Sequence, residues 1–275
     1  LYSSTTGNYN TGLGQGTLDS STTASNNTAI GWNALQTNTT GAQNVALGSQ
    51  SLYSNTTASN NVAIGFQALY ANTTGTRNSS VGTSSLEANT TGNYNTSIGY
   101  QALDANTTGT HNTAVGDTAL TQATTASNNT AVGQGALFAN TTGTQNVAIG
   151  VNALDANTTG SYNIGIGSGA LGSLTTPTHN TALGFNAGTT NITGGDNVYI
   201  GNYAGNSSTG VRNTYLGYSA GYSNSTASDN TCLGYSAGTN QTTGGQNVFI
   251  GRSARGSSGG TSVSIAIGFN IVGAG

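Results

Sequence analysis

The sequence predicts an all-β protein built as a parallel β-solenoid of about sixteen coils, each about 17 residues long. Three observations support this. A central glycine returns every 17 residues, with one interval of 16 residues between Gly201 and Gly217. The residue before it is always a branched aliphatic. The density of Gly, Asn and Thr, without a 3.6-residue apolar period, excludes helices. The central glycines are Gly14, Gly31, Gly48, Gly65, Gly82, Gly99, Gly116, Gly133, Gly150, Gly167, Gly184, Gly201, Gly217, Gly234, Gly251 and Gly268.

A short strand is expected immediately before each central glycine. The preceding residue is Ile64, Ile98 or Ile149 in three copies, and Ile, Val or Leu in the others. Such residues favour strands, and their unbroken column predicts one buried ladder along the stack. A second short strand is expected at the Ala-Leu pair that follows the glycine, for example Ala68-Leu69. Two short strands and two turns then account for the whole repeat.

Two glycine columns lie in the turns, and they have different requirements. One ends the recurring Ala-Asn-Thr-Thr-Gly, as in residues 71–75, where Asn first and Gly fourth indicate a type I turn. Ala58 and Pro177 replace that glycine elsewhere, and proline requires a negative φ, so the column is permissive. The central glycine, as at Gly65 and Gly99, is never replaced. It must need a positive φ or space that a Cβ would fill.

Asparagine stands four residues before the central glycine in fifteen of the copies, Ser264 being the exception. Examples are Asn61, Asn95 and Asn146. Stacked coils bring equivalent side chains to about 4.8 Å from one another. This column therefore predicts a ladder of hydrogen-bonded side-chain amides.

The predicted core changes along the chain. The fourth residue after the central glycine is Leu in the first ten copies, from Leu18 to Leu171, and then Gly in four copies. The second residue before the glycine is small in early copies and large later, except that Ala182 occurs with Gly188. Constant core volume explains this exchange. We predict one solenoid domain, residues 1–275, with a leucine-filled sub-array over 1–179 and a glycine- and aromatic-filled sub-array over 180–275. The later large residues are Tyr199, Tyr215, Cys232 and Phe249.

Both faces of the predicted strands are uncharged and mostly apolar. A thin solenoid has a single interior, so the second face requires a cover from outside the coil. Another copy of the same chain is the simplest cover, and cyclic self-association buries the same face of every copy. The sequence therefore predicts a homo-oligomer.

Composition excludes several classes of function. Charged residues make up 4% of the chain, the net charge is −3 and the four arginines are scattered, so no basic surface for nucleic acid is expected. No apolar run approaches the roughly 20 residues of a membrane span. Cys232 is the only cysteine, and its column indicates a small buried residue rather than a reactive thiol.

Residues of the catalytic and metal-binding types do not form a recognisable site in the sequence. His111 and His179 share a column but are four coils apart, which is too far for one metal ion. No pair of carboxylates has catalytic spacing, so neither an enzyme nor a bound cofactor or metal is expected. The Asn-Thr-Thr sequons would place glycans on consecutive coils, where they would collide, and turn formation explains these asparagines better. The carboxylates are Asp19, Glu87, Asp104, Asp117, Asp155, Asp196 and Asp229.

Residues 61–65, 27–31 and 264–268 resemble the head repeat of trimeric autotransporter adhesins of the YadA type. Similar repeats occur in phage tail fibres that end in an endosialidase-type chaperone domain. The resemblance covers the whole chain and implies a left-handed β-roll, a homotrimer, and display outside the cell or on a virion for attachment. The longer period, with its added Ala-Leu and Asn-Thr-Thr-Gly, is closer to the fibre variety. The 275 residues carry no coiled-coil stalk, membrane anchor or chaperone domain, so both owners stay open.

Aromatic residues after the central glycine are the candidate ligand-binding residues. Trp32, Phe66 and Tyr100 occur in alternate coils, and aromatic faces on an uncharged surface suit sugar rings. Packing on a neighbouring strand or across an oligomer seam is the competing explanation and the one we favour. We expect a non-enzymatic extracellular fibre or adhesin segment that attaches its owner to a host receptor, possibly a glycan, and acts as a rigid trimeric spacer. The alternative is an ice-binding solenoid, with Thr39-Thr40 and its equivalents as the hydroxyl array.

Overall fold

The computed structural model describes residues 3 and 5–273, which contain strands, turns and bends but no α-helix. The chain forms two compact units, residues 1–142 and 143–275. In each unit every complete coil supplies a three-residue strand just before its central glycine. The predicted all-β parallel solenoid is therefore confirmed. The predicted sub-array boundary near residue 180 falls inside the second unit.

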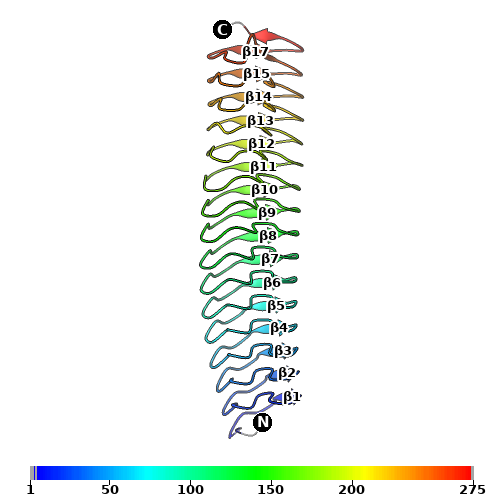
Figure 1. Ribbon diagram of the computed structural model, residues 1–275, viewed down its shortest axis with the longest axis vertical. Helices are drawn as coiled ribbons and strands as arrows, with labels where there is room; N and C mark the ends of the chain where they lie inside the picture. Colours follow the sequence, from blue (N-terminus) through cyan, green and yellow to red (C-terminus); the bar gives the residue numbers. More distant parts are fainter. Residues whose placement is uncertain (1–2, 4, 274–275) are drawn as a thin grey trace. The chain divides into compact units, whose positions relative to one another are not determined.

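The first unit contains eight strands that pair in parallel with their neighbours in the sequence. Figure 1 shows them side by side, one per coil. The register is one repeat, as in the pairing of Val45 with Val62. The strands are β1 (Thr11–Leu13), β2 (Thr28–Ile30), β3 (Val45–Leu47), β4 (Val62–Ile64), β5 (Ser79–Val81), β6 (Thr96–Ile98), β7 (Thr113–Val115) and β8 (Thr130–Val132).

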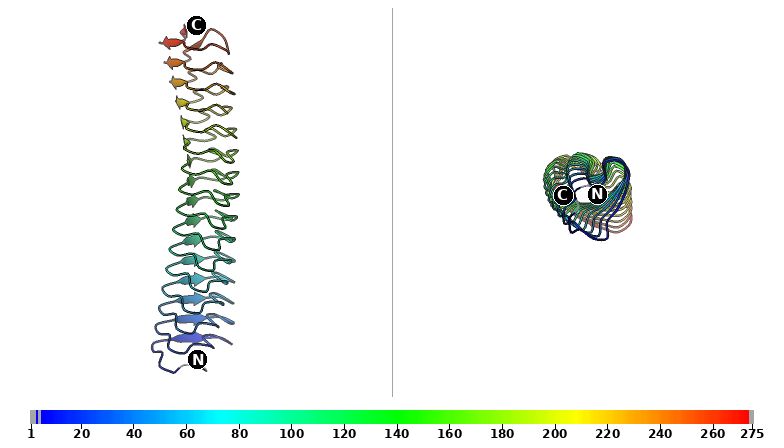
Figure 2. Two further views of the ribbon diagram at one scale, coloured as in Figure 1. Left: turned by 90° about the vertical axis from the view of Figure 1, so that its left-hand side faces the viewer. Right: turned by 90° about the horizontal axis from the view of Figure 1, so that it is seen from below.

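The second unit repeats this arrangement, and Figure 2 shows its strands following one another along one side of the stack. Across the shortened repeat Val198 pairs with Thr214, so the missing residue is taken up outside the strands. Two short strands pair separately, β16 (Arg255–Gly256) and β18 (Val272–Gly273). The remaining strands are β9 (Val147–Ile149), β10 (Ile164–Ile166), β11 (Thr181–Leu183), β12 (Val198–Ile200), β13 (Thr214–Leu216), β14 (Thr231–Leu233), β15 (Val248–Ile250) and β17 (Ile265–Ile267).

The central glycines meet both requirements that the sequence suggests. All sixteen have a φ between 121° and 142°, a region that is open essentially to glycine alone. A Cβ at Gly65 or Gly99 would also overlap the carbonyl of the central glycine in the next coil. A Cβ at Gly150 would lie 2.7 Å from the carbonyl oxygen of Gly167. Successive backbones therefore approach one another too closely here for any side chain.

The predicted second strand at the Ala-Leu pair is wrong. The leucines of this position, Leu69 among them, have φ values of 49–55°, which turn the chain instead of extending it. A left-handed conformation costs an L-residue roughly 1–2 kcal/mol. Full burial of the leucine is worth roughly 1.5–3 kcal/mol and offsets that cost. The pair is therefore a tight turn whose leucine fills the interior.

The prediction that the branched aliphatics form a buried ladder is also wrong. Ile64, Ile98 and Ile149 are 37, 42 and 39% exposed, whereas Ala63 and Ala148, one residue earlier, are completely buried. Side chains alternate across a strand, so only one of the two columns can face inward. The interior already holds the leucine and an alanine beside it, such as Ala68, and it admits a small residue from the strand. The larger aliphatic side chain consequently faces outward.

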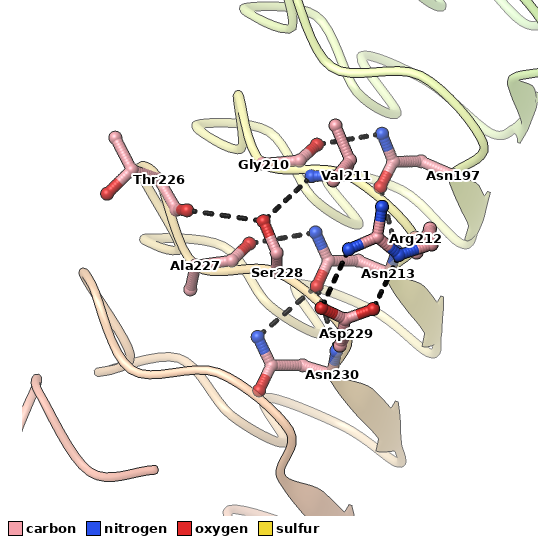
Figure 3. Close-up of polar contacts among 10 residues, drawn as sticks. All are labelled: Asn197, Gly210, Val211, Arg212, Asn213, Thr226, Ala227, Ser228, Asp229 and Asn230. Carbon is pink, nitrogen blue, oxygen red and sulfur yellow. Dashed lines mark hydrogen bonds and ion pairs between the residues drawn. The ribbon is translucent and has the colours of Figure 1, made fainter.

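The predicted asparagine ladder is present. Its side-chain amides bond to one another in several coils, as from Asn247 to Asn230 at 2.9 Å, and they also bond to the backbone. The Asn61 side-chain oxygen accepts from the backbone N–H of Asn78 at 2.9 Å, and its amide donates to the Gly75 carbonyl at 2.9 Å. Asn95 and Asn146 make the same pair of bonds. Figure 3 shows the amide-to-carbonyl bonds of two later members of the column. Each of these buried amides thus joins two parts of neighbouring coils.

A second asparagine ladder runs through the Asn-Thr-Thr-Gly bends of the first unit. The Asn72 amide donates to the Asn55 side-chain oxygen at 3.0 Å, and the Asn89 amide donates to that of Asn72 at 2.8 Å. Asn72 also closes its own bend with a 2.9 Å bond to the Gly75 carbonyl. Here too the amides bond directly to one another, the pattern that the sequence predicts for the first column.

The exchange of leucine for glycine has a direct packing reason. Gly188 and Gly205 keep the left-handed conformation of the leucines, with φ values of 62° and 58°. A Cβ at either glycine would overlap the ring of Tyr199, which is completely buried. One tyrosine ring therefore fills space in two coils. This explains why Ala182 can occur with Gly188, since the ring from the next coil supplies the missing volume.

We predict that Gly99→Val destabilises the protein far more than Gly268→Val. Both glycines have the same conformation, with φ values of 142° and 136°, so backbone strain is matched. A Cβ at Gly99 meets the backbone of the next coil, whereas at Gly268 it meets only the Ile271 side chain, at 2.9 Å. Thermal unfolding should show a much lower Tm for Gly99→Val. Equal losses would mean that close backbone approach does not limit this column.

Candidate functional site

The predicted ligand-binding residues lie on the outside of the first unit. Trp32, Phe66 and Tyr100 are 50, 48 and 53% exposed, and none has a ring contact among the described residues. They occupy alternate coils, about 9.6 Å from one to the next. Ser49 and Thr83 occupy the same position in the coils between them. These three residues thus present single, separated rings.

The second unit gathers aromatic rings into one exposed cluster. Tyr203 lies 5.4 Å from Phe185, 6.0 Å from Tyr218 and 6.4 Å from Tyr222, with edge-to-face geometry in each pair. Tyr218 also stacks on Tyr235 at 5.3 Å. We call these five residues the aromatic cluster. It joins rings from four consecutive coils, whereas Trp32, Phe66 and Tyr100 each stand alone.

The cluster surrounds an open depression of about 400 Å³. Tyr203, Tyr218, Ser219 and Tyr222 line it. Its volume lies within the range of small-ligand sites, but the depression is open to solvent rather than enclosed. Tyr218 directly follows a central glycine and so belongs to the aromatic column predicted from the sequence, whereas Tyr203 and Tyr222 lie outside that column. Their signal was a tyrosine at positions that are usually small or polar in other coils.

Arg252 extends the cluster towards the end of the unit. Its guanidinium carbon lies 5.5 Å from the ring centre of Tyr235 and 5.5 Å from that of Phe269. Within residues 3 and 5–273 it forms no ion pair. A cation between two rings is held by their quadrupoles while its hydrogen-bond donors stay available.

Another exposed column stands five residues before each central glycine. In the first unit, Arg77 lies 5.2 Å from the Tyr94 ring, which stacks on His111 at 4.8 Å. In the second unit, Tyr162 stacks on His179 at 5.1 Å. Both histidines are therefore stacked on tyrosine, and no group of three metal-binding side chains occurs among the described residues.

The same column carries the ion pairs of the second unit. Arg212 donates two hydrogen bonds to Asp229, at 2.6 and 3.0 Å, as Figure 3 shows. His179 lies 3.9 Å from Asp196. Exposed pairs of this kind contribute little to stability, because solvent screens their attraction. The charged residues of this column therefore form exposed ion pairs and no binding or catalytic site.

The only thiol is buried, as the sequence predicts. Burial raises the pKa of Cys232 to about 12, so the sulfur stays protonated and unreactive at neutral pH. The asparagines of five sequons are also completely buried, so an enzyme that adds glycans could not reach them in the folded chain. These are Asn38, Asn55, Asn72, Asn89 and Asn106.

One carboxyl group has a strongly shifted pKa. Burial, and then the charge of Glu87 in the neighbouring coil, raise the pKa of Asp104 to about 6. The two residues share a column, and sequence spacing alone did not single them out as a pair.

Comparison with known proteins identifies no relative. No family model matches the chain, and no curated protein or solved structure matches it either. No helix in residues 3 and 5–273 is long and apolar enough to span a membrane.

We predict that Asp104→Asn stabilises the protein at neutral pH. A group whose folded pKa is raised contributes stability below its unfolded pKa, near 3.8, and loses it as pH rises through about 6. The wild type should therefore lose stability across this window relative to Asp104→Asn, as followed by denaturant unfolding. Glu87→Gln should move the loss to lower pH, because it removes the second cause of the shift. Parallel pH profiles for wild type and Asp104→Asn would contradict this assignment.

Proposed function

We propose that this chain is a non-enzymatic segment of an extracellular fibre or adhesin, on a bacterial surface or a phage tail. In this proposal it assembles as a homotrimer of left-handed β-rolls, attaches its owner to a host surface and acts as a rigid spacer. The observation that carries the proposal is the exposed row of branched aliphatics on the outer face of the strands.

The exposed row continues along each unit. Ile30 and Ile98 of the first unit are 39 and 42% exposed, and Leu183 and Leu216 of the second unit are 46 and 41% exposed. Monomeric proteins seldom expose long apolar surfaces, and parallel sheets usually have both faces covered. Cyclic assembly would bury the same row in every copy, because each copy presents an identical face. The three-fold symmetry and the attachment role come from the resemblance to adhesin and fibre repeats.

The state of the thiol and of the two histidines supports a non-enzymatic function. The single thiol is buried and protonated. The histidines are engaged in stacking with tyrosine. We therefore assign the chain a binding and structural role, with no cofactor.

We predict that the wild-type chain is a trimer in solution and that Ile98→Asp weakens it. A carboxylate in the aliphatic row would be buried without a partner in the assembly, at a high desolvation cost. Thr91→Asp, at an exposed bend of the neighbouring coil, is the matched control and should stay trimeric. Sedimentation velocity measures both. A wild-type chain that is a stable monomer would refute the trimer.

The ice-binding alternative has less support than attachment. The Thr39 hydroxyl donates to the Thr56 carbonyl at 3.0 Å, and Thr56 repeats this bond to Thr73 at 3.2 Å. The hydroxyl of the first threonine in each pair therefore already donates a hydrogen bond to the next coil. Thr40 and Thr57 are exposed, but they form a single row.

A single row of hydroxyls does not present a surface that matches ice in two dimensions. We therefore expect no thermal hysteresis from the purified chain above that of a non-binding protein at equal concentration. A clear hysteresis gap that disappears in Thr57→Val would favour the ice-binding function instead.

A further inference from the structure

The aromatic cluster of the second unit has the features of a built binding site. Edge-to-face packing around Tyr203 holds the rings at steep angles, 62–88° between planes, so they form a concave surface. Only Tyr218 and Tyr235 of the cluster stack face to face. The depression lined by Tyr203, Tyr218 and Tyr222 is therefore accessible to a cyclic ligand.

The tyrosine hydroxyls of the cluster have hydrogen-bonding capacity left for a ligand. None of the hydroxyls of Tyr203, Tyr218, Tyr222 and Tyr235 bonds to another described residue. This contrasts with the core, where the Tyr215 hydroxyl and the Asn224 amide are 2.8 Å apart. Aromatic faces together with unpaired hydroxyls suit a molecule that has both C–H faces and many hydroxyls, as a sugar has.

The positive charge of Arg252 indicates that the ligand is anionic. Arg252 lies beside the cluster without a carboxylate partner. Between Phe185 and Phe269 the sequence has only two carboxylates, Asp196 and Asp229, and both stand in the separate column that contains Arg212. A guanidinium of this kind pairs well with a carboxylate or sulfate.

We propose that the aromatic cluster and Arg252 form a binding site for an acidic polysaccharide. Sugar rings would pack in the depression against Tyr203, Tyr218 and Tyr222, and the anionic group of a neighbouring sugar would pair with Arg252. This inference rests on the attachment function proposed above and names its ligand class. It assigns the main contact to the second unit rather than to Trp32, Phe66 and Tyr100.

The site is compatible with a trimer that covers the aliphatic row. Tyr203 stands two residues and Tyr222 five residues after a central glycine, beyond the end of the strand. The aliphatic residue precedes the glycine and lies on the outer face of the strand. Covering that face leaves the segment after the glycine available for the ligand.

Calorimetric titration of the whole chain tests the site with four defined polymers. Alginate carries carboxylates, carrageenan carries sulfates, and carboxyl-reduced alginate and dextran are neutral. We expect one or both anionic polymers to bind more tightly than the neutral ones. Tyr218→Ala should weaken this binding about tenfold or more. Arg252→Gln should weaken anionic binding and leave neutral binding unchanged.

Tyr162→Ala is the matched control, because Tyr162 is 51% exposed, close to the 46% of Tyr218, and lies in the same unit outside the cluster. It should bind like the wild type. Tyr222→Ala provides a second variant if Tyr218→Ala unfolds, and thermal unfolding of each variant accompanies the titrations.

Several results would overturn the inference. These are no binding to either anionic polymer, equal losses in Tyr162→Ala and Tyr218→Ala, or a loss confined to Trp32→Ala. A Tyr218→Ala chain that dissociates from trimer to monomer would assign the cluster to the subunit interface instead. Attachment itself is judged separately: a trimer that adheres to cells with these variants unaffected keeps the proposed function and rejects only this site.

Discussion

Close backbone approach at the central glycine is the constraint on which the rest of the coil depends. Each of these residues has a φ that glycine alone adopts freely, and the space where a Cβ would stand holds the next coil's backbone at most of them. The strand must therefore end at the glycine in every coil. The chain then turns through the left-handed residues that follow, which places alanine and leucine inside.

The repeat was enough to predict the fold class, because periodicity and invariance are direct consequences of stacking. A glycine that never varies, as at Gly99, indicates that the backbone there requires glycine. A column that admits Pro177 indicates that the backbone there has no such requirement. The asparagine columns could be predicted for a similar reason. A buried side-chain amide needs hydrogen-bonding partners in the neighbouring coils, so asparagine recurs in every coil. The sequence could not show which groups those amides bond to, because both asparagine columns have the same spacing.

Apolar character alone predicts the wrong direction for the side chains of the strand. A branched aliphatic such as Ile98 was placed inside because it is the most apolar residue in the strand. The interior is narrow and is already occupied by leucine, so Ser97 faces inward and Ile98 outward. The left-handed conformation of the leucines could not be predicted from the sequence. It is unfavourable for an L-residue, so no propensity would indicate it, and only the later glycines at the same position hint at it.

The later coils show how such a framework can acquire a site. Replacing leucine by glycine keeps the backbone angle, as at Gly205, and removes the strain of a left-handed L-residue. It also opens room for Tyr199 inside, so the coil keeps its volume without keeping its sequence. Because the backbone is set by the central glycines, exposed positions can change independently of the core. The cluster around Tyr203 is then a local change of surface on an unaltered scaffold, which is how a repetitive chain can hold one specific binding site among many equivalent coils.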